Sequence, residues 1–356
     1  MKKNKIAVVG AGFFGCLISI KILELKNIEV DLYEKKKDIL LSASGKNQMR
    51  AHSGYHYPRS QETVKEIQSS MKVFEEFFPK NIFEKTTNYY SIAKNNSKTN
   101  SNQYIKFMKK NKLFFKEIHN FKYFKKEYID KIFKVNERII NIFKVRSFLK
   151  KQIKQKGVNL ILNKAFTKDK VKNYDYIFYA TYNENNFNIK NITKKIKKKK
   201  FELVEKILVK MPKFFKKKSI VVLDGNFVCI DPFLGTNLHL LSDVKFSKIE
   251  KQYKKFPIFK SGSKNYLNKS LIRNIRASNF NKFIKNSSKY LPILEYAKYY
   301  GSFYVVRSIY KDKNDRRTTD ITKINSKIYT VHSGKWINSV LTSKKIQSIL
   351  RREISK

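Results

Sequence analysis

The sequence of 356 residues lacks the usual means of cross-linking a chain or holding a metal. Its two cysteines, Cys16 and Cys229, provide neither a disulfide framework nor a metal-ligand spacing, so we expect a cytoplasmic protein in a reducing compartment. The histidines His52 and His56 are four residues apart, but Gly54 and Pro58 make a helix there implausible and no H-E-x-x-H motif is present. We therefore predict no metal site.

Long apolar segments and internal repeats are also missing. The charge-free stretch from Ile6 to Ile20 is shorter than the roughly 20 apolar residues that a membrane span needs. No small-x-small cleavage site follows it, so we do not read it as a signal peptide. We expect a chain without a membrane span that divides into about two domains.

Acidic residues are scarce: 28 aspartates and glutamates stand against 78 lysines and arginines, a formal net charge of +50. Such an excess would suit a nucleic-acid partner, because cations neutralise phosphates. The lysines are spread along the whole chain, however, and only the block 194–200 is dense. No recognised nucleic-acid module accompanies them, so we interpret the charge as a composition bias on solvated faces and expect no nucleic-acid partner.

The most informative pattern that is present lies at the N-terminus. A short apolar strand leads into G-x-G-x-x-G at Gly10, Gly12 and Gly15, an apolar helix follows, and a second strand ends at Glu34. The first glycine permits the tight turn, the second lets the backbone approach a pyrophosphate, and the third lets the helix pack close to the sheet. A carboxylate at the second strand accepts hydrogen bonds from ribose hydroxyls and disfavours a 2′-phosphate, an argument that the cation Lys35 weakens. The pattern predicts a dinucleotide-binding site.

Strand and helix patterns predict an α/β protein with interleaved domains. Short buried strands alternating with helices recur in residues 1–75, 140–190 and 300–356, and we assign these blocks to one Rossmann-like domain with a parallel sheet. Residues 76–139 and 191–299 are assigned to an inserted α+β substrate or cap domain built on an antiparallel sheet. Within it, residues from about 250 to 298 read as helical.

Four patches together resemble the D-amino-acid oxidase-like superfamily of FAD-dependent oxidoreductases. They are the glycine turn with Glu34, the loop 43–57 with its small residues and H-x-G, the strand 174–181 and the turn 331–336. Tyr182 and Ser333 depart from the glycines usual in the last two. The resemblance implies an FAD site formed by Gly10, Gly12, Phe13, Phe14, Gly15, Glu34, Lys35, Ser44, Asn47, Gln48, Arg50, Ala180, Thr181, Gly334, Lys335 and Trp336.

The resemblance also implies hydride transfer to the flavin from a C–H next to an amine or hydroxyl. The substrate would be small and polar, anionic or polyhydroxylated: an amino acid, a 2-hydroxy acid or a sugar derivative, with an electron acceptor that the sequence does not identify. Candidate catalytic or substrate-facing residues are His52, Tyr55, His56, Tyr57, Arg59 and Arg307.

Other interpretations of the same residues stay open. Loop side chains can serve only to fix the loop, and Arg50, Arg59 and Arg307 can instead pair with acidic residues, as buried charges do. Lys335, near the ring, would stabilise negative charge on a reduced flavin, or it is a surface lysine at a helix start. The alternative function classes are an FAD-dependent tRNA-modifying enzyme and a flavoenzyme resembling a sugar-nucleotide mutase.

Overall fold

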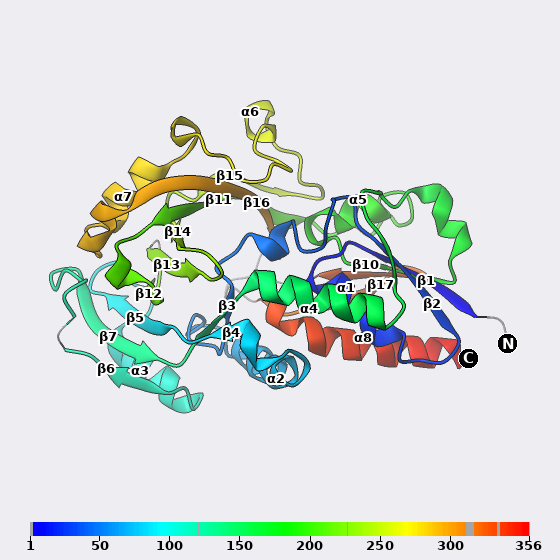
Figure 1. Cartoon of the computed structure of the whole chain (residues 1–356), viewed down its shortest axis with the longest axis horizontal. Helices are drawn as coiled ribbons and strands as arrows, with labels where there is room; N and C mark the ends of the chain where they lie inside the picture. The colour runs from blue at the N-terminus through cyan, green and yellow to red at the C-terminus, as the bar shows by residue number, and fades with distance from the viewer. Residues whose placement is uncertain (1–2, 120, 226, 311–316, 333–334, 356) are drawn as a thin grey trace.

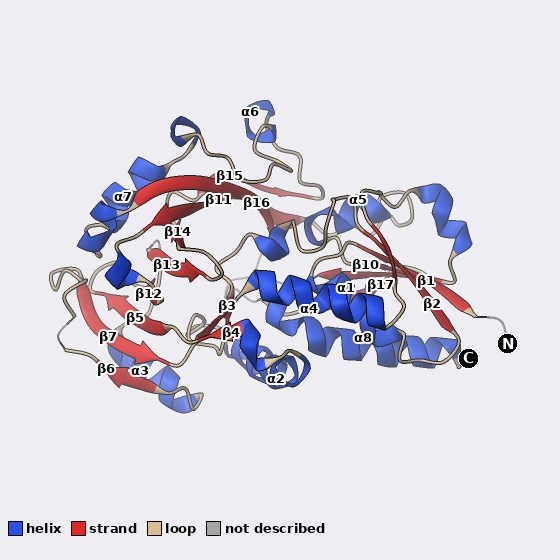
Figure 2. Cartoon of the chain, in the orientation of Figure 1, coloured by secondary structure: helices blue, strands red, loops and turns tan. Residues whose placement is uncertain are grey.

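The protein was analysed as a computed structural model that describes residues 3–119, 121–225, 227–310, 317–332 and 335–355. These residues form two lobes that lie side by side (Figure 1). One lobe combines a mainly parallel sheet with long helices, and the other is dominated by a large curved sheet (Figure 2). The chain passes between the lobes several times, so each lobe is assembled from distant segments.

The first lobe contains a six-stranded sheet, counted over the described residues, in the order β17-β18-β10-β1-β2-β9. Its strands are β1 (Asn4–Val9), β2 (Ile28–Tyr33), β9 (Asn159–Ile161), β10 (Tyr176–Tyr179), β17 (Asp320–Lys323) and β18 (Ile328–His332). All neighbours are parallel except β17 and β18. At the carboxyl end of β1 the neighbours β2 and β10 lie on opposite sides, which is where open α/β sheets bind ligands.

Helix α1 (Phe13–Ile22) follows β1 and is buried on nearly its whole surface. This explains why it carries no charge before Lys21: one side packs on the sheet and another on α8 (Ser339–Ile354). The Gln347 side chain of α8 donates a hydrogen bond of 2.6 Å to the Lys21 carbonyl at the end of α1. The C-terminal helix is therefore part of the layer that holds the glycine turn in place.

The second lobe contains a nine-stranded sheet, again counted over the described residues. Its strands are β5 (Thr87–Ala93), β6 (Phe115–Glu117), β7 (Ile129–Val135), β11 (Lys199–Lys210), β12 (Lys218–Leu223), β13 (Val228–Phe233), β14 (Leu238–Asp243), β15 (Lys248–Lys254) and β16 (Lys298–Ile309). Neighbours are antiparallel apart from β5 and β12.

Two segments differ from the sequence-based expectation. Strand β16 falls in the block assigned to the Rossmann-like domain, but it pairs with β11 along almost its full length and so belongs to the second sheet. Strand β15 begins the stretch that we expected to be helical; its pairing with β11 outweighs a local pattern rich in lysine. The division of the chain into two interleaved domains otherwise stays a prediction.

A small sheet of β3 (Arg50–Ala51), β8 (Arg138–Ile140) and β4 (Phe83–Glu84) lies between the two larger ones. The remaining helices are α2 (Gln61–Phe77), α3 (Ser101–Lys110), α4 (Ile142–Gln155), α5 (Asn185–Ile189), α6 (Ser261–Lys264) and α7 (Phe280–Ser287). No helix in the described parts of the chain combines the length and hydrophobicity needed to cross a bilayer.

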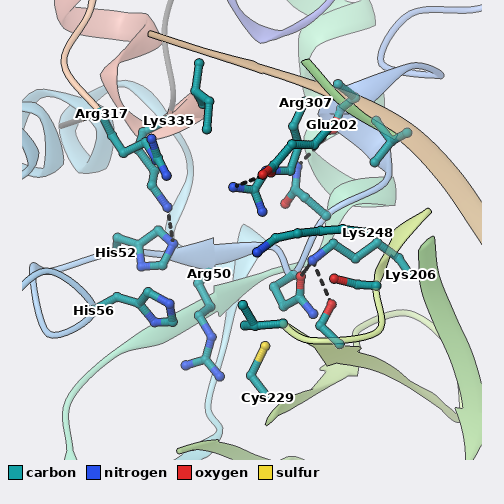
Figure 3. Close-up of a pocket in the computed structure, with 18 of the residues that line it drawn as sticks. Arg50, His52, His56, Glu202, Lys206, Cys229, Lys248, Arg307, Arg317 and Lys335 are labelled. Carbon is teal, nitrogen blue, oxygen red and sulfur yellow. Dashed lines mark hydrogen bonds and ion pairs between the residues drawn. The ribbon is translucent and has the colours of Figure 1, made fainter. Parts of the chain in front are cut away.

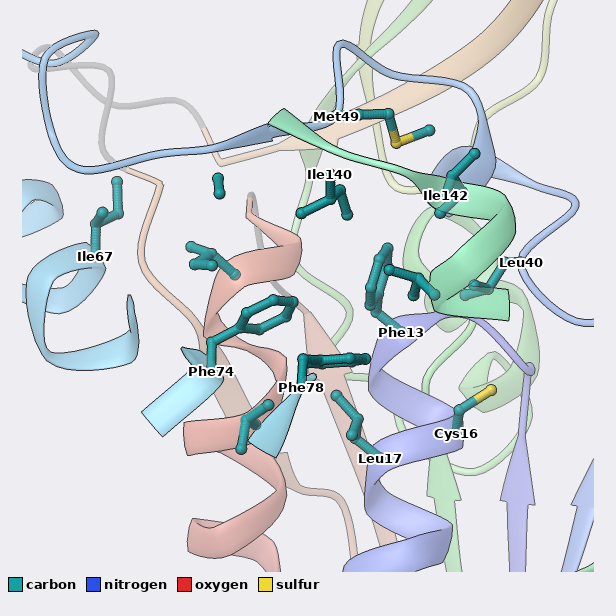
Figure 4. Packing of buried hydrophobic residues seen from close by; sticks show 14 of the residues in the cluster. Phe13, Cys16, Leu17, Leu40, Met49, Ile67, Phe74, Phe78, Ile140 and Ile142 are labelled. Atoms are coloured by element: carbon teal, nitrogen blue, oxygen red, sulfur yellow. The ribbon is translucent and has the colours of Figure 1, made fainter. Parts of the chain in front are cut away.

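The main hydrophobic core lies where α1, α2, α4 and α8 meet this small sheet. Phe13 of α1 stacks on Trp336 with ring centroids 5.0 Å apart, and Phe74 of α2 approaches the same indole at 5.2 Å. Figure 4 shows Phe13, Phe74 and Phe78 gathered with Met49 and Ile140. This packing fixes the start of α1 relative to the loop that carries the predicted site residues.

Candidate functional site

The glycine turn has the geometry that its sequence predicts. Gly10 adopts a φ of +98°, and a Cβ there would meet the Ala180 carbonyl oxygen at 3.0 Å. A Cβ on Gly15 would overlap the carbonyl of Gly10. A Cβ on Gly12 would lie 2.8 Å from the Ser44 Oγ, which itself accepts a hydrogen bond from the Phe13 amide (3.2 Å). The amino end of α1 is thus open to a close ligand only because Gly12 has no side chain.

Glu34, at the end of β2, accepts hydrogen bonds from the Ala11 amide (2.9 Å) and the Lys36 amide (3.0 Å). The carboxylate therefore ties the second strand to the glycine turn. The neighbouring cation Lys35 forms an ion pair of 2.6 Å with Glu184, so it is directed toward another loop.

Hydrogen bonds from its own side chains stabilise the loop after β2, residues 43–49. Asn47 donates to the carbonyls of Ala43 and Ser44 and accepts from the Met49 amide. Gln48 behaves differently, because its Oε1 accepts a hydrogen bond of 2.7 Å from Lys206 on β11. In this loop Asn47 fixes the backbone, whereas Gln48 connects it to the second sheet.

His52 lies between a carboxylate and an amine. Its Nδ1 is 3.4 Å from Glu137 Oε1, and its Nε2 is 3.0 Å from the Lys335 Nζ (Figure 3). Burial and the Lys335 charge lower the pKa of His52 to about 4. Burial and the nearby Arg50 lower the pKa of Lys335 to about 7. Near neutral pH His52 is therefore neutral, and Lys335 gains or loses its proton close to pH 7.

The other aromatic residues of the loop have distinct environments. His56 packs edge-on against His52 and Tyr90, and burial lowers its pKa well below the usual value. Tyr57 lines the cavity, with the Lys335 Nζ 4.6 Å from its ring centre. Tyr55 is 1% exposed, donates to the Phe114 carbonyl and is absent from the cavity wall, so its contacts hold the loop instead.

Each of the three candidate arginines has an acidic partner. Arg50 is fully buried and forms ion pairs with Asp231 on β13 and with Glu137. Arg59 Nε donates to Asp224 (2.7 Å), and Arg307 lies 3.4 Å from Glu202. Both Arg50 and Arg307 line the cavity, but Arg50 is buried in ion pairs that connect the lobes, whereas the Arg307 side chain is 37% exposed.

The last two patches also converge on this region. Ala180 and Trp336 line the cavity, while Thr181 donates to the Asn185 side chain at the end of β10. Tyr182, where the superfamily usually has glycine, adopts a φ of +57° and stacks on His332 with centroids 5.4 Å apart. The backbone thus keeps a conformation that favours glycine, although the residue at this position is a tyrosine. Gly334 lies outside the described residues.

Most of the predicted residues line one cavity of about 920 Å³ between the lobes, whereas Gly10, Gly15, Glu34, Lys35, Tyr55 and Thr181 do not. Its described wall includes Gly12, Phe13, Phe14, Ser44, Asn47, Gln48, Arg50, His52, His56, Tyr57, Arg59, Ala180, Arg307, Lys335 and Trp336. The wall has eight lysines and four arginines but two acidic residues, Glu202 and Asp224. A cavity with this charge favours anionic ligands.

Sequence reasoning missed Glu137, Asp231, Lys206 and Lys248. The sequence contains a signal for Glu137 and Asp231. Carboxylates are rare in this chain, so an acidic residue next to an apolar segment is a candidate partner for a buried cation. The two lysines had no such signal among so many. The described residues hold no cluster of three or more potential metal ligands of the His, Cys, Asp and Glu types.

Comparison with known proteins assigns the fold. No protein-family model matches the chain. Glycine oxidase from Geobacillus kaustophilus superposes with a TM-score of 0.69 over 99% of this chain and 95% of its own, at 11% identity. L-α-glycerophosphate oxidase from Mycoplasma pneumoniae, with FAD bound, gives a TM-score of 0.70 over 100% and 96%, at 13% identity.

A curated sequence relative is the FAD-dependent monooxygenase FPY4 of Fusarium mangiferae, 28% identical over 156 residues. That match covers 42% of this chain and 40% of the fungal protein, so less than half of each is aligned. The structural matches show that the chain has the fold of the D-amino-acid oxidase-like FAD-dependent oxidoreductases. The fold predicted from the sequence is confirmed.

Proposed function

We propose that the chain is an FAD-dependent oxidoreductase that removes a hydride and a proton from a small anionic substrate. The observation that carries the proposal is the cradle at Gly12. It is open at the amino end of α1, at the carboxyl edge of the parallel sheet, and continuous with a cavity that holds ionisable side chains. The fold shared with an FAD-bound oxidase supports the choice of cofactor.

The residues present fit this cofactor. The backbone of residues 10–15 would receive the pyrophosphate, and Glu34 would accept the ribose hydroxyls. Phe14, Ser44 and Trp336 line the same cavity as Gly12 and His52, and this cavity would receive the remaining part of the dinucleotide. When bound, FAD supplies the hydride acceptor.

Lys335 and His52 are suited to take the substrate's proton. Oxidation of an alcohol or amine breaks a C–H bond with its electron pair and an O–H or N–H bond as a proton, which leaves a carbonyl or an imine. Neutral Lys335 has a lone pair on Nζ to accept that proton. His52 accepts a hydrogen bond from Lys335 at Nε2 while its Nδ1 faces Glu137, so the carboxylate orients the ring and selects the tautomer.

Arg307 is the candidate for holding the anionic group of the substrate. It projects into the cavity from β16, and its guanidinium suits a carboxylate or a phosphate. Arg59, also in the wall, is already engaged with Asp224 at 2.7 Å. We therefore assign Arg307 to the substrate and Arg59 to the shape of the loop.

Replacement of Gly12 by valine tests the proposal. The Gly12 φ of −76° accommodates any residue, and the nearest obstacle is the Ser44 Oγ, which can rotate away at the loss of one hydrogen bond, so the variant should fold. The valine side chain would occupy the space of the pyrophosphate, and bound FAD, measured by its visible absorption after gel filtration, should fall at least tenfold. Gly262→Val is the control, because a Cβ at Gly262 meets nothing within 4 Å. A colourless wild-type protein, or a Gly12→Val protein that keeps its FAD, would refute the proposal.

A further inference from the structure

One side of the cavity carries a cluster of cations, of which the proposed reaction uses only Arg307. Lys200, Lys206, Lys248 and Arg307 line this side together with a single acid, Glu202. Glu202 forms ion pairs with Lys200 (2.8 Å) and Arg307 (3.4 Å). Lys206 and Lys248 have no carboxylate within 4 Å among the described residues.

Lys206 is held in place by neutral groups. Its ammonium donates to the Gln48 Oε1 and to the Ser242 Oγ, each at 2.7 Å. An ammonium has three donors, so one N–H remains for a ligand. Burial lowers the pKa of Lys206 to about 8, which means that the folded protein pays a desolvation cost for this charge.

Lys248, on β15, approaches the same space from the neighbouring strand. Burial lowers its pKa as well, with Arg307 contributing in the same direction. In Figure 3, Lys206, Lys248 and Arg307 reach the cavity from the side opposite His52, His56 and Lys335. Cations that face one another in a half-buried wall repel, and an anion between them would relieve that repulsion.

We propose that Lys206, Lys248 and Arg307 form a subsite for a dianionic part of the substrate, either a phosphate ester or two neighbouring carboxylates as in malonate. This inference rests on the proposed function and narrows its substrate class. Together with Lys200 and Glu202, the subsite has four cations and one carboxylate, so a dianion balances its charge better than a single carboxylate would. Its position opposite Lys335 places the anionic end of the substrate away from the group that takes the proton.

The experiment uses the purified holoprotein and three probes at fixed ionic strength: inorganic phosphate, malonate and acetate. Binding is followed by calorimetry and by the melting temperature. We expect phosphate or malonate to bind at least tenfold more tightly than acetate. A preference for phosphate assigns the phosphate-ester class, and a preference for malonate assigns the dicarboxylate class.

Lys206→Met and Lys248→Met should each weaken that binding at least tenfold. Lys254→Met is the matched control, since Lys254 is an exposed residue of the same strand as Lys248 and does not line the cavity. Equal affinity for acetate and the dianions, or binding that ignores both substitutions, would overturn the subsite. A colourless protein with Lys206-dependent phosphate binding would refute the flavin proposal and support the subsite. A yellow protein without that binding would support the flavin proposal and refute the subsite.

Discussion

Removing the Arg50 side chain should be among the most damaging single changes in this protein. Arg50 is 2% exposed, and the side chains of its partners Glu137 and Asp231 are completely buried. In Arg50→Met both carboxylates would keep their burial and lose their cation. Breaking one buried pair costs roughly 3–5 kcal/mol, and domains of ordinary stability unfold with about 5–15 kcal/mol. We therefore expect a loss of about 4 kcal/mol or more in urea denaturation at pH 7.

The pH dependence of that loss gives an independent check. In the wild type, His52 and Arg50 overcome the effect of burial and hold the pKa of Glu137 below its ordinary value, so this group loses its stabilising effect as the pH falls. Burial already raises the pKa of Asp231 to about 6 in the wild type, and removal of the cation raises the folded-state pKa of both carboxylates. The folded variant then binds protons more readily than the unfolded chain, and the deficit should shrink between pH 7 and pH 5.

Arg138→Met is the control for removing an arginine. Arg138 pairs with Glu75 on the surface, and both side chains are at least 40% exposed. That substitution should cost about 1 kcal/mol or less. If Arg50→Met were equally mild, or if its deficit did not depend on pH, the buried network would not act as described.

Two further predictions concern other buried groups. The rate of flavin reduction should rise with pH through about 7, where Lys335 loses its proton. Lys335→Met should lower this rate by roughly 10²–10⁴-fold and remove the inflection from the pH profile. The measurement is anaerobic stopped-flow reduction of the loaded enzyme, and an inflection that persists in the variant would contradict the assignment. His239 is 4% exposed beside Phe215, and burial lowers its pKa to about 4, so between pH 6.5 and 4 the unfolded chain takes up its proton first and stability falls with pH. His239→Phe should abolish that contribution, so the free energy of unfolding of the variant relative to the wild type should be about 2–3 kcal/mol higher at pH 4.5 than at pH 7. The same difference between variant and wild type at both pH values, measured by denaturation, would contradict this prediction.

The glycine turn could be predicted from the sequence because its determinants are local. Gly10, Gly12 and Gly15 act within one turn, and Glu34 meets the Ala11 amide one strand later. The sequence predicts both His52 and Lys335 as site residues, because each lies in a patch that resembles the superfamily, but it does not predict their contact. The third member of this group, Glu137, has no local pattern and reaches His52 only because β3 pairs with β8.

Other parts of the site depend on contacts that no local pattern contains. Arg50 meets Asp231 across 181 positions of sequence, so its role as a buried connector could be stated only as an alternative. Lys206 and Lys248 differ from other lysines only in what surrounds them. The sequence predicts a helix where β15 forms, because the pairing of β15 with β11, and not its own composition, determines its conformation.

The strand order of the six-stranded sheet also constrains how this protein is made. Strand β1 is complete once residue 9 has been translated, yet its neighbour β10 arrives near residue 176, and β18 near residue 328. Helix α8, which covers α1, follows at residues 339–354. A nascent chain therefore carries β1 paired with β2 on one edge only, and α1 without its cover by α8, through much of its synthesis. Slow translation of the last part of the message would prolong that exposure. Because the helix that follows the N-terminal glycine turn is covered by the C-terminal helix, we expect folding of this protein to depend on chaperones.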